Sequence, residues 1–347
     1  MEPNIFDKMQ AIDRRWVFLM IALAVIIPFA FKLTFREVAT PEVKAIYNLI
    51  DKLPKGSPVL LALDFDPPSE PELKPMAYAY ARHLALKGHK IYMITLWPVG
   101  QNEIVDVVSE VLNKEFPPHH WVKGTQKVNP WNVKAADLKK LGFKGKAGKD
   151  IKAREWLAKG FKKVDNPKGY KNGRDYVKLG FKAGNQGVIN TILYDFKELY
   201  TTDADSVPVN KIPMMTGIKN LKDMKLILNV SAGFPGLKEW VQFGGDTSGV
   251  PVAGGVTAVS APLLYPYYPK QLKGLMGGLK AAAEYESLLL SGYKQLKGKV
   301  KAKALSRMGP QTVAHLVIIL FILIGNIAYF LSSNRAGRGP RLRSTQS

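Results

Sequence analysis

The sequence predicts an α/β fold, a doubly wound and mostly parallel sheet flanked by N- and C-terminal transmembrane helices. Two observations lead to this prediction. Apolar runs of strand length alternate with helical patterns through the middle of the chain, as expected when helices connect parallel strands that are buried on both faces. An uncharged apolar run also lies near each end, over residues 16–31 and 313–332.

Both apolar runs are predicted to be membrane helices. A bilayer core about 30 Å thick needs about 20 helical residues. The run at 313–332 meets that length, and the shorter run at 16–31 extends to residue 35, with Lys32 able to snorkel. The alternative for the first run is a cleaved signal peptide, since Arg14 and Arg15 precede it, but no small-residue cleavage site follows. We therefore expect two retained anchors and a multi-pass protein of the cell membrane.

The pattern between the anchors predicts alternating helices and strands, which together indicate a Rossmann-like domain. In chain order we expect a helix at 41–53, a strand at 58–65, a helix from a capping box at Ser69 to 87, a strand at 90–97, a helix at 101–116, a strand at 175–181, a helix at 188–199, a strand at 224–230, a helix at 237–243, a strand or strand pair at 250–260 and a helix at 270–290. The last helix would place Leu272, Leu275, Leu279 and Ala282 on one face, with Gly274 and Gly278 at the spacing of a close helix contact.

Composition shifts suggest how the chain is divided. The predicted parts are a short tail (1–15), transmembrane helix 1 (16–35), the first half of the α/β domain (36–122), a basic Gly/Lys-rich insertion (123–174), the second half of the α/β domain (175–292), a basic linker (293–312), transmembrane helix 2 (313–333) and an Arg-rich tail (334–347).

The formal net charge of +22 is concentrated between residues 123 and 182, where 18 Lys and Arg residues stand against five acids. Such a stretch suits anionic lipid headgroups. It also suits nucleic acid, because aromatic residues such as Trp131, Trp156 and Phe161 are interleaved with the lysines. A solvated insertion is the third alternative. For a membrane-tethered domain we favour membrane lipids or solvation over nucleic acid, and we expect the insertion to bury little apolar surface.

The amino-acid composition also limits which catalytic groups and metal sites the chain can form. The chain has no cysteine, so disulfides, thiolate nucleophiles and cysteine-based zinc sites are excluded. The adjacent pair His119–His120 has no matched ligands nearby in the sequence. We therefore predict neither a metal site nor a cofactor.

Candidate ligand-binding residues lie in the loops that follow the predicted strands, because open α/β sheets bind ligands beyond the carboxyl ends of their strands. Two of these loops join glycines to the start of a helix, where free N–H groups favour an anion. Neither loop matches the dinucleotide or P-loop signatures, and tight turns that require glycine are the alternative. The candidates are Asp64, Asp66, Thr95, Gly184, Asn185, Gly187, Ser231, Gly233 and Ser260.

Asp64, Asp66 and Thr95 form a pattern that resembles the beginning of the haloacid dehalogenase phosphotransferase motif. The resemblance implies Asp64 as nucleophile, Asp66 as acid/base and Thr95 as phosphate ligand, with Mg²⁺ beside the two aspartates. The sequence departs from the motif at Pro67-Pro68-Ser69, where a Gly-Thr turn is usual. It also lacks a clear lysine motif and a second acidic pair, unless Asp203 and Asp205 or Asp246 serves. The alternative is that the two aspartates have no catalytic role and either cap the following helix or line a solvent-facing polar rim.

The runs GVTAVSAPLLYPYYPKQLKGLMGGLKAAAEYE, NVSAGFPGLKEWV, DFDPPSEPELKPM and HLVIILFILIGN resemble an uncharacterised prokaryotic family of two-pass membrane proteins. The resemblance covers most of the chain apart from the basic insertion. It implies the layout of the chain and no activity.

These observations favour a binding or scaffold protein with a small polar or anionic ligand at the strand ends, and a membrane-anchored phosphotransferase or hydrolase using Asp64 and Asp66 is the alternative. The short tails weigh more than a long domain in setting orientation. Because Arg335, Arg338, Arg341 and Arg343 follow the second run without an acid, we expect cytoplasmic tails and an extracytoplasmic domain. The basic insertion favours the opposite orientation, because it would suit the anionic cytoplasmic leaflet. Assembly into homo- or hetero-oligomers stays open.

Overall fold

The structure, a computed structural model, describes residues 13–31, 33, 35, 37–143 and 147–336, with side chains described as far as residue 330. The predicted tails at 1–15 and 334–347 therefore lie almost entirely outside the described residues. The chain divides into two compact units. One unit comprises residues 37–304, and the other combines the segment before residue 37 with the segment after residue 304.

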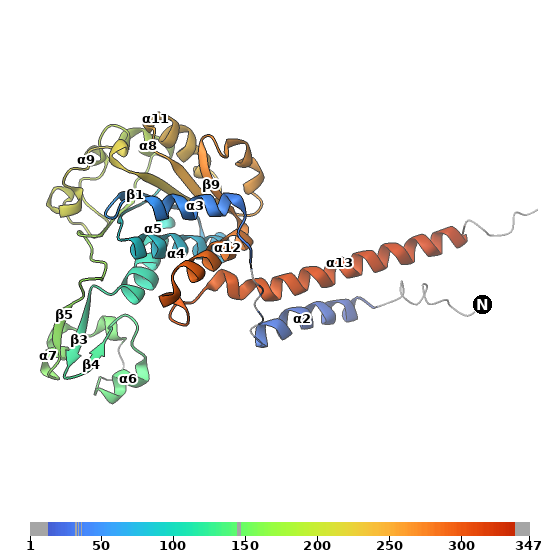
Figure 1. Cartoon of the computed structure of the whole chain (residues 1–347), viewed down its shortest axis with the longest axis horizontal. Coiled ribbons are helices and arrows are strands. Elements are labelled where there is room, and N and C mark those ends of the chain that lie inside the picture. Colours follow the sequence, from blue (N-terminus) through green and yellow to red (C-terminus); the bar gives the residue numbers. More distant parts are fainter. Residues whose placement is uncertain (1–12, 32, 34, 36, 144–146, 337–347) are drawn as a thin grey trace, which may run out of the picture. The chain divides into compact units, whose positions relative to one another are not determined.

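A six-stranded parallel sheet forms the centre of the larger unit (Figure 1). In spatial order its strands are β6 (Tyr176–Phe181), β2 (Lys90–Thr95), β1 (Pro58–Asp64), β7 (Leu226–Ser231), β8 (Val252–Val256) and β9 (Leu272–Gly277). Numbered along the chain, this is the order 3-2-1-4-5-6 of the Rossmann fold. The predicted Rossmann-like α/β architecture is confirmed. The order reverses between β1 and β7, so ligands of this fold bind beside the carboxyl ends of those two strands.

The central strands are continuous apolar runs because both faces of the sheet are covered. Residues 59–63 of β1 expose no surface. Two adjacent glycines of β8 show that helices pack on both faces of the sheet. A Cβ atom on Gly254 would press on Leu237, whereas one on Gly255 would press on Met76. Helices therefore approach β8 closely from both sides.

The helices form two layers (Figure 1). Helices α3 (Pro41–Lys52), α4 (Glu70–Lys87), α5 (Gly100–Val107) and α12 (Gly278–Gly292) make one layer. The other layer contains α8 (Gln186–Ile192), α9 (Phe196–Leu199), α10 (Leu237–Glu239) and α11 (Asp246–Ser248), with a π-helical segment at Trp240–Gly245 between the last two. The apolar residues of this second layer, such as Ile189 and Trp240, pack on Leu60 and Ile94 of the sheet.

Several predicted elements are present with altered ends. The predicted helix at 188–199 is two helices, α8 and α9, and the one at 101–116 is α5 continued by a π-helical segment at Val108–Asn113. The predicted capping box at Ser69 is wrong. A short 3₁₀ turn at Pro67–Ser69 precedes α4, and the Ser69 hydroxyl donates to Asp66 Oδ1 at 2.7 Å instead of capping the helix.

The predicted helix at 270–290 is also wrong in its first part. Residues 272–277 form the edge strand β9, and only from Gly278 does the chain become α12. The physical reason is close packing of α3 on this strand. A Cβ atom on Gly274 would collide with Ile46 of α3, so this glycine admits a helix against a strand, whereas Gly278 lies against Ala258 at the start of α12.

The basic insertion folds as a small subdomain with its own sheet. Strands β3 (His119–Lys123), β4 (Gln126–Val128) and β5 (Lys162–Asp165) pair antiparallel in the order β4-β3-β5. Helices α6 (Ala135–Lys140) and α7 (Ala153–Ala158) complete it. We call residues 119–174 the basic subdomain. Its core consists of Trp121, Val128, Leu138, Phe143, Ile151, Trp156 and Phe161.

The expectation that the insertion buries little apolar surface is therefore wrong. Trp156 is fully buried and stacks on Trp121, with ring centroids 5.5 Å apart and planes only 4° from parallel. This core was not recognisable in the sequence, because its seven apolar residues are spread over about forty positions among many lysines and show no helix or strand period.

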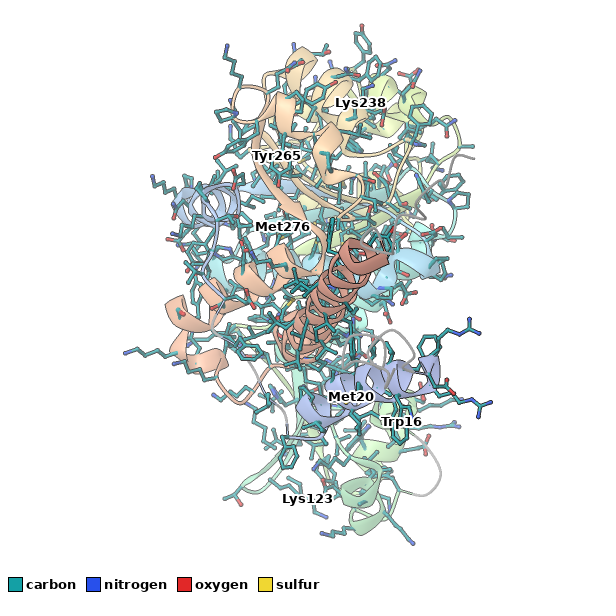
Figure 2. The ribbon with its side chains drawn as sticks, turned by 90° about the vertical axis from the view of Figure 1, so that its right-hand side faces the viewer. Trp16, Met20, Lys123, Lys238, Tyr265 and Met276 are labelled. Atoms are coloured by element: carbon teal, nitrogen blue, oxygen red, sulfur yellow. The ribbon has the colours of Figure 1, made fainter. Side chains whose placement is uncertain are left out.

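The smaller unit contains α2 (Arg14–Ala30), with 17 residues, and α13 (Lys303–Ala336), with 34 residues. Within the described part of the chain, one helix is long and apolar enough to cross a membrane, the segment Lys303–Phe330 of α13. Its apolar side chains face outward, with Leu316 60% exposed and Phe330 65% exposed. Helix α2 likewise exposes Trp16, and Figure 2 labels Trp16 and Met20 on it.

Candidate functional site

A buried carboxylate lies where the strand order reverses. Asp64 ends β1, exposes no surface and accepts three hydrogen bonds. Leu96 N–H, just after β2, donates to Oδ1 at 2.6 Å. Asn229 Nδ2 on β7 and Trp240 Nε1 on the following π-helical segment donate to Oδ2 at 2.7 and 2.9 Å. One side chain thus ties together β1, β2, β7 and the helical layer behind β7.

The electrostatics of Asp64 follow from its burial. Transfer of a carboxylate out of water disfavours its charged form, and burial raises the pKa of Asp64 to about 7. The hydrogen bonds from Leu96, Trp240 and Asn229 act in the opposite direction, because they stabilise the ionised form. Burial is the larger of the two effects.

The loops around Asp64 are tied to one another. Ala232 N–H donates to the Asp64 carbonyl at 3.1 Å, so the turn after β7 is joined to the end of β1. Trp97 Nε1, after β2, donates to the Pro235 carbonyl at 2.8 Å. Ser260, after β8, lies with its hydroxyl 3.5 Å from the Ala232 carbonyl. The turn at residues 231–236 is therefore the meeting point of the loops from four strands.

Two more of the predicted site residues are buried in this region. Thr95 exposes no surface, and its hydroxyl exchanges hydrogen bonds of 3.0 Å with the backbone of Trp97. Ser231 Oγ accepts from Leu237 N–H at 2.9 Å and so supports the first turn of α10. Both side chains hold loop backbone in place.

The remaining predicted residues are accessible. Asp66 and Ser260 are half-buried, and Gly233 is exposed beside the Trp97 ring. Gly184 and Asn185 are exposed in the turn after β6, where Asn185 adopts a positive φ of 49°, and Gly187 is exposed in the first turn of α8. This turn shares the carboxyl edge of the sheet, but no described hydrogen bond joins it to the turn at 231–236. The structure thus brings together Asp64, Thr95, Ser231, Gly233 and Ser260 and leaves the Gly184 turn apart.

The interpretation of Asp64 as a solvent-facing rim carboxylate is wrong, because the side chain is enclosed by β2, β7 and Trp240. A nucleophile has to reach its substrate, and Asp64 presents no surface to one. Among the described residues, no group of three or more histidines and acids is arranged to hold a metal ion. The observed contacts of Asp64 are with Leu96, Asn229 and Trp240 of the protein itself.

Two residues that complete the network were not expected from the sequence, Asn229 and Trp240. An asparagine within the apolar run LILNVS is a detectable signal, since a buried amide needs a hydrogen-bonding partner. Trp240 resembled an ordinary core residue, because its indole N–H acquires a partner only when the helical layer packs on the sheet.

No family model, no curated protein and no solved structure matches this chain. The fold and the site define a Rossmann-like α/β protein whose switch point is occupied by a buried polar network.

Proposed function

We propose that the chain is a two-pass membrane protein that presents a Rossmann-like domain near the bilayer, with a binding or scaffold role rather than a catalytic one. The observation that carries this proposal is the apolar surface of α13, whose segment Lys303–Phe330 exposes side chains such as Leu320, Leu323 and Phe330. In water such a surface would be strongly unfavourable, whereas lipid chains cover it without cost.

Helix α2 supports a second span. Its 17 residues rise about 25 Å, somewhat less than the roughly 30 Å of a hydrocarbon core. Local thinning of the bilayer offsets a mismatch of this size. Phe18 and Phe29 are 67% and 74% exposed, and Arg14 and Arg15 stand at the start of the helix, where an interface would place them.

The ligand, a small polar or anionic molecule, is assigned to the accessible rim of the carboxyl edge. The turn at 231–236 supports this assignment, because loops from four strands meet there and the Asp64 network holds them in position. Gly233 and Phe234 are exposed in that turn, and Ser260 is half-buried in the neighbouring loop. A rim whose loops are held in position by an enclosed Asp64 suits recognition better than group transfer through that aspartate.

Fractionation with carbonate at high pH tests the membrane assignment. Three truncated chains, lacking residues 1–36, residues 305–347 or both, are compared with the full chain. We expect the full chain and both single truncations to stay in the membrane pellet and the double truncation to become soluble. Release by removal of residues 305–347 alone would show that α2 is not an anchor.

A thermal-shift measurement on the detergent-solubilised chain tests the ligand assignment, with inorganic phosphate and ATP as probes. We expect a rise in Tm that Gly233→Asp removes, because a carboxylate at the rim repels an anion. Gly187→Asp introduces the same charge at an open position in the first turn of α8 and should retain the shift. Loss of the shift in Gly187→Asp alone would move the site to the turn after β6, and no shift with either probe would leave only the scaffold role.

A further inference from the structure

We propose that the basic subdomain is an electrostatic docking surface for anionic phospholipid headgroups, through the face of its sheet that its own core leaves uncovered. This inference rests on the proposed membrane anchoring, because the anchors would keep the subdomain near lipid. It identifies a second contact of the chain with the bilayer, separate from the spanning helices.

The first observation is unpaired charge. Of the described basic residues in the basic subdomain, only Arg174 makes an ion pair, with Asp175. The others that are exposed are Lys123, Lys127, Lys134, Lys139, Lys140, Lys149, Lys152, Arg154, Lys162, Lys163, Lys168 and Lys171. Figure 2 labels Lys123 among them. Each basic residue near an anionic leaflet contributes about 1 kcal/mol, so a cluster of this size is sufficient for docking.

The second observation is an uncovered sheet face. Trp121 and Val128 pair with each other and are buried in the core, so their alternate neighbours face the other way. Those neighbours are His120 and Val122 on β3, Lys127 on β4, and Lys162 and Val164 on β5, and none of them is buried. Lys127 and Lys162 both stand opposite Val122.

This face combines lysines with apolar groups. Val164 is 48% exposed, and Val122 lies between the two lysines. An interfacial surface needs this mixture, because ammonium groups bind phosphates while short apolar side chains enter the boundary between headgroups and acyl chains.

Burial of the aromatic residues disfavours nucleic acid as the occupant. Single-stranded nucleic acid is held by exposed rings on which bases stack. Trp156, Phe161 and Phe143 are 0, 2 and 6% exposed, so their faces are occupied by one another. On the uncovered sheet face, positive charge lies beside valines and His120, which fits a lipid surface better than a base.

The experiment uses the whole chain in lipid nanodiscs. Because the sequence has no cysteine, Thr125→Cys in the turn between β3 and β4 accepts a single environment-sensitive fluorophore. Discs of phosphatidylcholine alone are compared with discs containing about one third phosphatidylglycerol. We expect a blue shift of emission only with phosphatidylglycerol, and its loss at high salt, because salt screens these contacts.

Charge reversal locates the contact. Lys127→Glu with Lys162→Glu should lower the docked-to-undocked ratio by at least about tenfold. Lys219→Glu with Lys222→Glu changes the same charge at exposed positions of the Rossmann-like domain and should leave the ratio unchanged. Circular dichroism checks that both double variants keep their folded spectrum.

Three results would overturn the proposal. They are an emission spectrum that does not respond to phosphatidylglycerol, an equal effect of the two double variants, and a blue shift produced by polyuridylate with phosphatidylcholine discs, which would assign the surface to nucleic acid. A chain that does not co-elute with the discs would instead refute the anchoring, and flotation with preformed phosphatidylglycerol vesicles then tests the docking surface directly.

Discussion

At the scale of single residues, Asp64 connects segments that are more than 150 positions apart in the sequence, from β1 to Asn229 and Trp240. A buried carboxylate is unfavourable unless hydrogen bonds compensate for the loss of water. Here both oxygens accept from fixed donors. The network therefore specifies how the loops at the switch point are placed. Substitution of Asp64 measures how much the network contributes to the free energy of unfolding.

We expect Asp64→Asn to lower the free energy of unfolding by about 2–3 kcal/mol, because the new amide N–H₂ faces at least one buried donor that then has no acceptor. Urea denaturation of the detergent-solubilised chain measures the change. Asp66→Asn is the matched control and should change stability by less than about 1 kcal/mol, since Asp66 is half-buried and accepts from the nearby Ser69 hydroxyl. Equal effects would contradict the structural role of Asp64.

The stability difference between the wild-type chain and Asp64→Asn should depend on pH. Burial raises the folded-state pKa of Asp64 to about 7, above its value of about 3.9 in an unfolded chain. The folded state therefore holds a proton that the unfolded state has lost between these two values. The contribution of Asp64 is complete below pH 4 and decreases by about 1.4 kcal/mol per pH unit up to pH 7.

Denaturation of both chains at pH 5 and pH 8 measures this dependence. The wild-type advantage should be larger at pH 5. A difference that is constant over this range would show that Asp64 is already ionised at pH 5.

At the scale of elements, the glycines of residues 272–278 were predicted to lie in a helix, but Gly274 lies in the strand β9. The segment LKGLMGG carries the apolar spacing of a helix, yet it forms the edge strand on which α3 packs. Apolar periodicity over a few residues cannot distinguish a helix from a buried strand. The deciding contact is between Gly274 and Ile46, which belong to elements separated by most of the domain.

Gly274→Val should lower the thermal midpoint and cost about 1–3 kcal/mol, because the added side chain collides with Ile46 of α3. Lys273→Val, at the exposed neighbouring position of the same strand, provides the control. It should be nearly neutral, since valine suits a strand. A neutral Gly274→Val would mean that α3 does not pack on β9.

Trp156→Ala should unfold the basic subdomain selectively, because removal of a fully buried tryptophan costs about 3–5 kcal/mol and this core has only seven buried members. Hydrogen exchange should accelerate in β3 and β5 while β1 and β7 stay protected. Leu157→Ala, at a side chain that is 57% exposed, should leave both sheets unchanged. Uniform acceleration across the chain would show one cooperative unit.

At the scale of the whole molecule, the contact pattern separates residues 37–304 from the two helical ends. The larger unit has its own apolar core on both faces of the sheet, whereas the smaller unit presents apolar side chains outward. Under the proposed membrane anchoring, the larger unit is surrounded by water and the smaller unit by lipid, and each unit can be tested without the other.

The fragment 37–304 should be soluble without detergent and unfold cooperatively, with a thermal midpoint within a few degrees of the detergent-solubilised full chain. The physical reason is that its core is complete within these residues. Size-exclusion chromatography and calorimetry measure both properties. Aggregation of a fragment that retains its helical spectrum would indicate that the removed ends cover part of its surface.

The apolar runs and their alternation were sufficient to predict the α/β class, the first five strands of the large sheet and most of its helices, because burial on both faces leaves a continuous signature in a short stretch of sequence. The sixth strand was not predictable in this way, since β9 depends on the contact of Gly274 with α3. The loops that carry the candidate site were predicted from the same rule of strand ends, and in the structure the Ser260 hydroxyl lies 3.5 Å from the carbonyl oxygen of Ala232, whose N–H donates to the Asp64 carbonyl.

What the amino-acid sequence by itself determined is the set of local properties: charge, the absence of cysteine, the apolar ends and the strand and helix periods. Only the tertiary structure decided that Asp64 is enclosed rather than exposed and that Trp156 belongs to a core rather than to a binding surface. Burial and hydrogen bonding depend on partners such as Trp240 and Trp121, which are distant in the chain. A local sequence pattern therefore cannot predict which side chains are buried by residues that are distant in the sequence.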